Sequence, residues 1–320
     1  MGRAFIRVIG EGKPVVLREA GNRNLHRFAV LTAFCTFLLI IAGALVTSNQ
    51  AGLSIPTWPF AYGSVFPPMV GGIRWEWSHR LAAATVAILT AILAVFIWVR
   101  ESRQWVRVLG VVAFLLVVAQ ALLGRFTVKT FLDPPVSASH ATLAELFFIV
   151  TVSLAVFTGK WWTSEVPQLR DEESPKLRSL AIATSCVILV QIVLGAAFRH
   201  NAFGIIPHII GAVVVTGMVF WTVLAVAVRF RKVRDLRVAA RYLEILLGLQ
   251  ILLGGAAYWA VVAARDAVQP TPLYVTVTVA HVAVGALTFA SSVFLTLRCY
   301  RILNPSHEAH VEHSTERALS

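Results

Sequence analysis

Four histidines within long apolar segments are the residues of this chain best suited to chemistry. His79, His140, His208 and His281 each lie in such a segment, in the half that is nearest to the same side of the membrane. An imidazole in hydrocarbon is costly unless it is paired or bound to a metal, so each of these histidines is a candidate functional residue. Two imidazoles on facing helices are suited to haem iron, whereas zinc needs further thiolate or carboxylate ligands. The pattern predicts two bis-histidine haem sites, His79 with His140 and His208 with His281.

A small residue follows each of these histidines after four positions. Residues at i and i+4 are neighbours on one helix face, so a small side chain there leaves a flat space beside the imidazole. A macrocycle that lies against a helix requires such a space. Close packing of small residues between membrane helices, with the histidines in interhelical hydrogen bonds, is the alternative explanation. The four small residues are Ala83, Ala144, Ala212 and Gly285.

One acidic residue distinguishes the first pair of histidines from the second. In the motif RWEWSHR, Glu76 precedes His79 by three positions and shares its face if the helix begins early. The equivalent stretch of the second half, GIIPHII, has Ile205 in place of the acid. An acid beside only one pair suggests that one haem undergoes chemistry while the other transfers electrons. The alternative is an interfacial carboxylate paired with Arg74 or Arg80.

Other polar residues supplement these sites. Glu145, five positions after His140, either belongs to a proton path or makes a helix–helix hydrogen bond. His200, in a short outer loop, contacts either a haem propionate or solvent. The motif HEAHVEH in the polar C-terminal stretch is either a metal site or a disordered segment. The candidates for propionate or loop contacts are Trp77, Arg80, Arg125 and Arg199, and the histidines of HEAHVEH are His307, His310 and His313.

The connection at about residues 49–77 is much longer than its counterpart at 199–206 and is rich in proline and tryptophan. Proline stiffens an extended loop, and tryptophan favours the membrane interface. We therefore expect this connection either to cover the first haem site as a lid or to anchor the chain at the membrane surface.

The composition is that of a membrane protein. Of 320 residues, 58% are hydrophobic and 14% are charged, against roughly 25% charged in a soluble domain. Apolar runs of about 20 residues match the length of helix that crosses a bilayer. The sequence predicts an all-α polytopic membrane protein with eight transmembrane helices, and it excludes a soluble globular fold. The expected spans are 28–48, 79–99, 106–126, 139–158, 178–198, 206–228, 240–262 and 273–297.

The positions of the 28 Lys and Arg residues indicate the topology. All but six lie in the termini and in every second connection, and the positive-inside rule places those parts in the cytoplasm. The net charge of +12 thus reports topology, and no soluble basic module suggests nucleic-acid binding. The six residues on the other side are Arg74, Arg80, Arg125, Lys129, Arg199 and Arg265.

Recurring motifs predict two pseudo-repeated four-helix bundles. The patterns QALLG, QIVLG and QILLG recur, and GALVTSNQAG aligns without gaps on GAAFRHNAFG. We expect a cytoplasmic N-terminal segment at 1–27, an N-terminal four-helix half with the first haem site at 28–165, a C-terminal half with the second haem site at 166–297, and a cytoplasmic polar tail at 298–320.

Taken together, these features resemble the haem A synthase family. The resemblance covers about residues 25–300 and depends on eight spans, one histidine in every second helix, and the motif EWSHR at 76–80. Two further segments look like motifs of that family, GALVTSNQAGLSIPTWP at 43–59 and SASHATLAE at 137–145.

The resemblance implies that the chain oxidises the ring D methyl group of haem O by successive hydroxylations and yields the formyl group of haem A for terminal oxidases. It implies that His79 and His140 flank the substrate haem, that His208 and His281 hold a haem b cofactor, and that Glu76 is the catalytic acid. It also implies a ferredoxin-like electron donor and contact with haem O synthase. The sequence does not specify the oligomeric state.

One departure from the family concerns cysteine. Many bacterial members have a cysteine pair in the first outer loop, but Ile55 stands where one is expected. None of the three cysteines lies in a connecting loop, so we expect no disulfide framework. The N-terminal residues show neither a removable signal peptide nor a transit-like presequence, which indicates a bacterial inner-membrane protein with both termini cytoplasmic.

Two other function classes fit part of the pattern. A di-haem b-type cytochrome that relays electrons without modifying haem would also need four histidines, but it would not need Glu76 or the long loop. A transporter built on parallel repeats would have eight spans and no haem.

Overall fold

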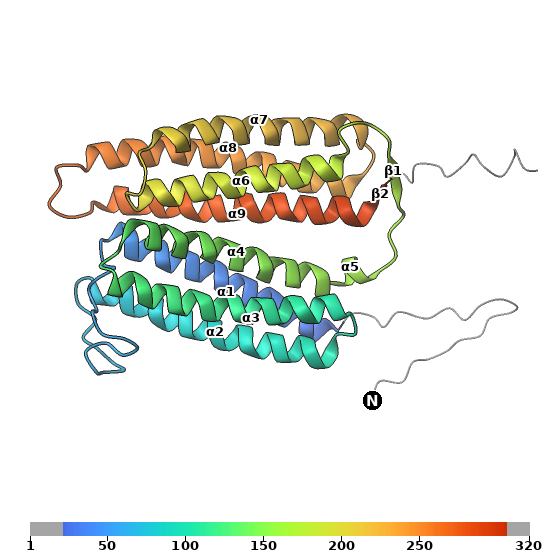
Figure 1. The fold of residues 1–320 in the computed structure, drawn as a ribbon. Coiled ribbons are helices and arrows are strands. Elements are labelled where there is room, and N and C mark those ends of the chain that lie inside the picture. Colours follow the sequence, from blue (N-terminus) through green and yellow to red (C-terminus); the bar gives the residue numbers. More distant parts are fainter. Residues whose placement is uncertain (1–21, 306–320) are drawn as a thin grey trace, which may run out of the picture.

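A computed structural model describes residues 22–305. Eight of its helices are long and apolar enough to cross a membrane, which confirms the predicted polytopic helical fold (Figure 1). They are α1 (Arg23–Ser48), α2 (Ile73–Arg100), α3 (Gln104–Lys129), α4 (Pro134–Thr158), α6 (Leu177–Arg199), α7 (Ile206–Arg229), α8 (Arg234–Ala263) and α9 (Pro272–Ile302).

Three short elements were not expected from the sequence. The helix α5 (Lys160–Thr163) follows α4, and the strands β1 (Leu169–Asp171) and β2 (Leu303–Pro305) pair in parallel. Segments of three or four residues carry no detectable hydrophobic period, because a period needs several turns or alternations to show. The strand pair joins the connection between α4 and α6 to the end of α9.

Several helices extend beyond the apolar runs that mark them in the sequence. The helix α2 begins at Ile73, six residues before its expected span, and α8 begins at Arg234 instead of residue 240. Hydropathy marks only the part of a helix that lies in hydrocarbon, whereas the helix continues through polar residues at the interface. The early start places Glu76 in the first turn of α2, on the helix that carries His79.

The helices form two groups of four, α1–α4 and α6–α9, that lie side by side (Figure 1). Each group has its own cluster of buried apolar residues. A smaller cluster connects the groups, with Ile40 of α1, Phe148 of α4 and Ala286 of α9. The two predicted halves, and their origin in a repeat, stay predictions.

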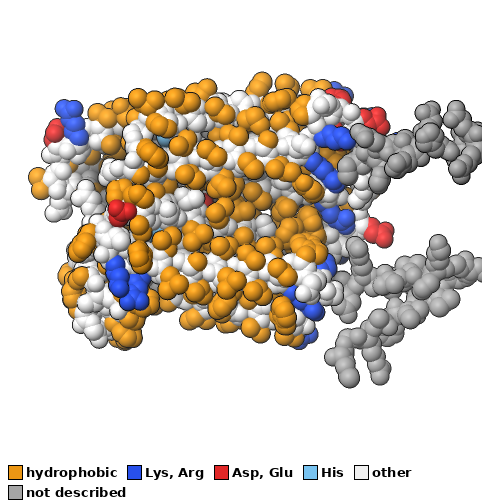
Figure 2. Space-filling model, viewed as in Figure 1, with side chains coloured by type: hydrophobic (Ala, Val, Ile, Leu, Met, Phe, Trp, Pro, Cys, Tyr) orange, Lys and Arg blue, Asp and Glu red, His pale blue; other side chains and the backbone are white. Residues whose placement is uncertain are grey.

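The two ends of the molecule differ. Residues 49–72 lie at one end, which we call the loop end, and β1 and β2 lie at the other, which we call the strand end (Figure 1). Charged side chains gather toward both ends, and the band between them is mostly apolar on the face seen in Figure 2. Many large apolar side chains of the spans are exposed, as expected of helices that face lipid.

Candidate functional site

Each of the four histidines packs against a glycine on the preceding long helix, in the part of the bundle nearest the loop end. A Cβ atom on any of these glycines would lie 2.9 to 3.1 Å from the Cε1 atom of the imidazole, so only glycine lets the ring approach so closely. The pairs are Gly43 with His79, Gly124 with His140, Gly195 with His208, and Gly254 with His281.

The second pair of histidines has the separation that a shared iron requires. The ring centroids of His208 and His281 are 6.3 Å apart, with an interplanar angle of 84°. Two imidazoles that bind one metal ion from opposite sides, with metal–nitrogen distances of about 2 Å, have ring centroids about 6 Å apart. The two helices that carry them, α7 and α9, therefore hold the imidazoles at a distance that suits a haem iron.

The first pair is also brought together, and neither imidazole is hydrogen-bonded within the described residues. The side chains of His79 and His140 are near enough for their charges to interact. The Nδ1 atoms of both are buried without a hydrogen-bond partner in residues 22–305. A buried polar atom without a partner is rare and calls for a bound ligand or a special role. The interhelical hydrogen bond considered for these histidines is thus absent at Nδ1, and the rings fit a ligand such as haem.

Three glutamines point at three of the histidines. The Nε2 atom of Gln120 donates to the backbone carbonyl of His140 at 3.1 Å, and that of Gln191 donates to the carbonyl of His208 at 2.8 Å. In the sequence these glutamines are visible only as part of a recurring pattern. The signal was the spacing, because a glutamine four residues before the glycine lies on the same helix face. The third contact joins Gln250 Nε2 to the Nε2 atom of His281 at 3.4 Å.

Glu76 is buried in the first half and has two partners. The backbone N–H of Ile55 donates to its Oε2 atom at 2.8 Å, and Arg80 Nη2 donates to its Oε1 atom at 2.5 Å. Glu76 as a whole is 4% exposed. The ion pair considered from the sequence is therefore present with Arg80, whereas Arg74 lies over the ring of Trp75. A carboxylate that is paired and buried, one turn from His79, is held in a fixed position.

Residues 49–72 are fastened to the first half. Arg80 donates to the carbonyl oxygens of Thr57 at 2.6 Å and Ile55 at 2.8 Å. The guanidinium of Arg125, on α3, lies 5.0 Å from the centroid of the Trp58 ring. The loop thus touches both α2 and α3 at the end where the histidines lie. Of the remaining candidates, Trp77 is half-buried and makes no polar contact in the described residues.

Arg199 is a half-buried cation between the two halves. Its Nη2 atom donates to the carbonyl of Ala44 at 3.0 Å and to the hydroxyl of Ser48 at 2.7 Å, both on α1. Ser48 in turn contacts Thr278 of α9 at 2.8 Å. Within residues 22–305 no carboxylate lies within 4 Å of Arg199, and its charge reaches His281. A half-buried guanidinium with only neutral partners favours an anionic ligand.

His200, the residue after Arg199, lies near the first pair of histidines. Burial, and next the positive charge of Arg199, lower the pKa of His200 to about 4, so its imidazole is neutral at pH 7. The imidazole of His140 is close enough to lower this pKa further. Glu145 of α4 is buried, and its Oε2 atom has no partner in the described residues, so the helix–helix hydrogen bond considered for it is absent there. The HEAHVEH motif lies outside the described residues.

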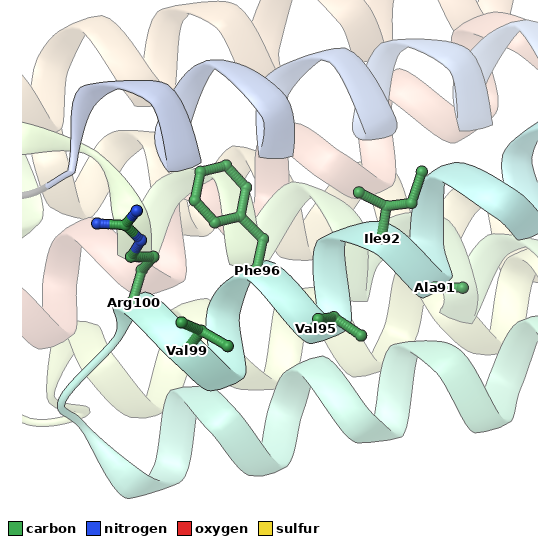
Figure 3. Close-up of a pocket in the computed structure, with 6 residues that line it drawn as sticks. All are labelled: Ala91, Ile92, Val95, Phe96, Val99 and Arg100. Carbon is green, nitrogen blue, oxygen red and sulfur yellow. The ribbon is translucent and has the colours of Figure 1, made fainter.

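A groove of about 530 Å³ lies on the outside of α2 and is not part of this site (Figure 3). Its lining runs from Ala91 to Arg100, toward the strand end, whereas His79 is near the other end of the helix. Its apolar side chains suit contact with lipid. Among the described residues, no group of three or more His, Cys, Asp or Glu side chains is arranged to hold a metal ion by itself.

The chain was compared with known proteins. Its residues 26–71 and 72–207 match the family model COX15-CtaA, described as cytochrome oxidase assembly protein. These ranges contain Glu76, His79 and His140, whereas His208 and His281 lie beyond them. The match thus includes the first histidine pair and its acid.

Curated relatives carry the name heme A synthase. The protein from Bacillus pumilus (strain SAFR-032) is 31% identical over 183 residues, which cover 55% of this chain and 59% of the relative. That from Lysinibacillus sphaericus (strain C3-41) is 30% identical over 189 residues, 56% of this chain and 59% of the relative. The matched part is thus less than two thirds of these relatives. Because the family model matches more than half of the chain, this protein belongs to the COX15-CtaA family of cytochrome oxidase assembly proteins.

Proposed function

We propose that this protein is a haem A synthase, a membrane oxidoreductase that converts the ring D methyl group of haem O into a formyl group by successive hydroxylations. The observation that carries the proposal is the asymmetry of the two histidine pairs. Both pairs are positioned alike against glycines, but only the first has a buried carboxylate, Glu76, one turn from a histidine. A protein that only relays electrons has no need of that acid.

The second pair is proposed to hold a haem b cofactor, with His208 and His281 as axial ligands. Their centroid separation of 6.3 Å supports this assignment. When bound there, haem b would supply single-electron transfer. Gly195 and Gly254 leave room for the two imidazoles, so α6 and α8 fix the position of each ring.

The first pair is proposed to bind haem O as substrate, between His79 and His140. Oxidation of a methyl group to a geminal diol is followed by loss of water, which needs a proton to be moved from one hydroxyl group to the other. Glu76 is a suitable group for that transfer, because Arg80 and the Ile55 N–H hold its two oxygens in place. General acid–base help of this kind contributes typically about 10²–10⁴-fold to a rate.

Arginine side chains are proposed to bind the propionates. Arg199 is the strongest candidate, since it is half-buried, has only neutral partners among the described residues and lies between the two pairs. Arg80 and Arg125 already contact the loop, so together with Trp77 they are proposed to close the first site. We further propose a bacterial inner-membrane location with both termini cytoplasmic, delivery of haem O by its synthase, and electrons from a ferredoxin-like donor.

The test is to express the protein in bacterial cells that make haem O but lack a haem A synthase. The haems are then extracted and separated by chromatography. Haem A or its hydroxymethyl precursor is expected. Unmodified haem O, together with haem b on the purified protein, would replace the proposal with a di-haem b-type cytochrome. A purified protein without haem would favour the transporter.

A further inference from the structure

A second pocket, which we call the basic pocket, lies at the strand end between β1 and the connection from α7 to α8. Its volume is about 440 Å³. Of its eight lining residues four are basic and none is acidic. The four histidines lie toward the opposite end of the bundle, so the basic pocket is separate from their site (Figure 1). The basic residues are Arg170, Arg229, Arg231 and Lys232, and the apolar ones are Leu169, Val228, Phe230 and Val233.

Three of the four cations of the basic pocket have no ion-pair partner in residues 22–305. Arg229 pairs with Glu173 at 2.7 Å, so its charge is compensated. Arg170, Arg231 and Lys232 are exposed, and none of them takes part in an ion pair of the described residues. A concave site lined by charges of one sign attracts ions of the opposite sign. The basic pocket therefore favours an anion.

The backbone beside the basic pocket adds to this preference. The helix α8 begins at Arg234, directly after Val233 of the pocket lining, and Val233 offers the first turn no side-chain acceptor. The first N–H groups of a helix carry a partial positive charge. The one acid of this turn, Asp235, lies 3.1 Å from Arg298 of α9, which compensates its charge. The positive charge at the start of α8 thus remains available to an anion.

An apolar stripe on the outside of α7 leads into the basic pocket. Trp221, Leu224 and Val228 follow one another at intervals of three and four residues, so they share one face of the helix. All three are exposed, Val228 by 69%, and Val228 also lines the basic pocket. Because α7 is one of the apolar spans, this stripe faces lipid. A molecule with an anionic head and an apolar tail would contact the pocket and the stripe together.

We propose that the basic pocket binds the headgroup of an anionic phospholipid whose acyl chains lie along the stripe of α7. The phosphate oxygens accept charge-assisted hydrogen bonds from Arg170, Arg231 and Lys232. Basic pockets beside transmembrane helices recognise anionic headgroups in this way. A zwitterionic phospholipid binds more weakly, because its own cation competes for the phosphate. The inference does not depend on the proposed function, since it involves no haem.

The test is native mass spectrometry of the full-length protein in detergent. Phosphatidylglycerol and phosphatidylcholine with the same acyl chains are added in equal amounts and titrated. The wild type should bind one phosphatidylglycerol more tightly than phosphatidylcholine. Each single replacement, Arg170→Gln, Arg231→Gln or Lys232→Gln, should weaken phosphatidylglycerol binding by about fivefold, the effect of one basic residue near a membrane surface, and the triple variant by about a hundredfold.

A matched control removes three other exposed basic side chains from the strand end. Arg23, Arg27 and Lys160 lie at this end but outside the basic pocket (Figure 1). The triple variant Arg23→Gln, Arg27→Gln and Lys160→Gln has the same net charge as the pocket variant, and it should keep the preference of the wild type. An equal loss in both triple variants would show that only the overall charge matters, and it would overturn the proposal.

Two further measurements decide what the basic pocket recognises. Glycerol 3-phosphate has the phosphate ester of the headgroup without acyl chains, and at the concentration of the lipid it should not displace phosphatidylglycerol. Displacement would show a site for a free phosphate ester and would contradict a lipid site. Phosphatidylglycerol should also raise the melting temperature of the wild type more than that of the pocket variant. Equal binding of the two lipids by the wild type would show that no anionic headgroup is recognised.

Discussion

The Nε2 atom of Gln191 lies 2.8 Å from the backbone carbonyl oxygen of His208, and Gly195, one turn further along the same helix, receives the imidazole of that histidine. One face of α6 thus fixes a histidine of α7 in two ways. The same combination recurs between α8 and α9, where Gln250 and Gly254 face His281.

The contact at Gly254 should be essential for haem binding at the second pair. In Gly254→Val the added carbons would meet the ring of His281, which a Cβ atom alone approaches to 3.1 Å. We expect loss of most of the low-spin haem b, measured as the haem-to-protein ratio of the purified variant. The neighbouring Gly255 is a matched control, because nothing lies within 4 Å of a Cβ atom there. Equal haem content in the two variants would contradict the prediction.

Replacement of the acid should separate catalysis from haem binding. Glu76→Gln keeps the size of the side chain but loses its charge, so we expect haem b to be retained while haem A falls by about 10²-fold or more. Haem O or an alcohol intermediate should accumulate, as chromatography of extracted haems would show. Glu101→Gln, which removes a carboxylate paired with Arg103 at the strand end, is the control. Normal haem A in the Glu76 variant would exclude a catalytic role.

The loop at residues 49–72 should depend on Arg80. Arg80→Met removes the donors to Thr57 and Ile55 but keeps much of the apolar stem, so the loop should become accessible to added protease. Digestion of the wild type and the variant, followed by mass spectrometry of the fragments, measures this. Arg74→Met is the matched control, because Arg74 contacts Trp75 and not the loop. Cleavage at the same rate in all three proteins would show that Arg80 does not fasten the loop.

The effect of Arg199 should depend on the ligand. Arg199→Gln keeps a donor for Ser48 and removes the buried charge. If the guanidinium binds a propionate, the variant should lower the melting temperature of the haem-loaded protein by several degrees and that of the haem-free protein by less. Thermal unfolding of both forms measures the difference. An equal loss in both forms would show that Arg199 only joins the helices.

Much of this architecture could be predicted from the sequence, because hydrophobic runs and histidine positions are local properties. The eight spans follow from these properties, and so does the half of the helix in which each of the four histidines lies. The start of α2 could not be placed, since the charged and aromatic residues before His79 lie outside the apolar run.

The contacts between distant segments could not be predicted. The path of the loop brings the N–H of Ile55 to Glu76, 21 residues away, and no periodicity encodes that path. The glutamines were visible as a pattern, but their partners on the next helix depend on how the helices pack.

The boundary between the two helix groups is fastened at both ends. At the loop end Arg199 joins α6 to α1, and at the strand end Trp161 donates to Asp235 of α8 at 3.0 Å while Arg301 of α9 donates to the carbonyl of Trp162 at 3.1 Å. Neither group can therefore lose its structure without removing partners from the other. In thermodynamic terms the two groups form one cooperative unit, and calorimetry should record a single transition for both.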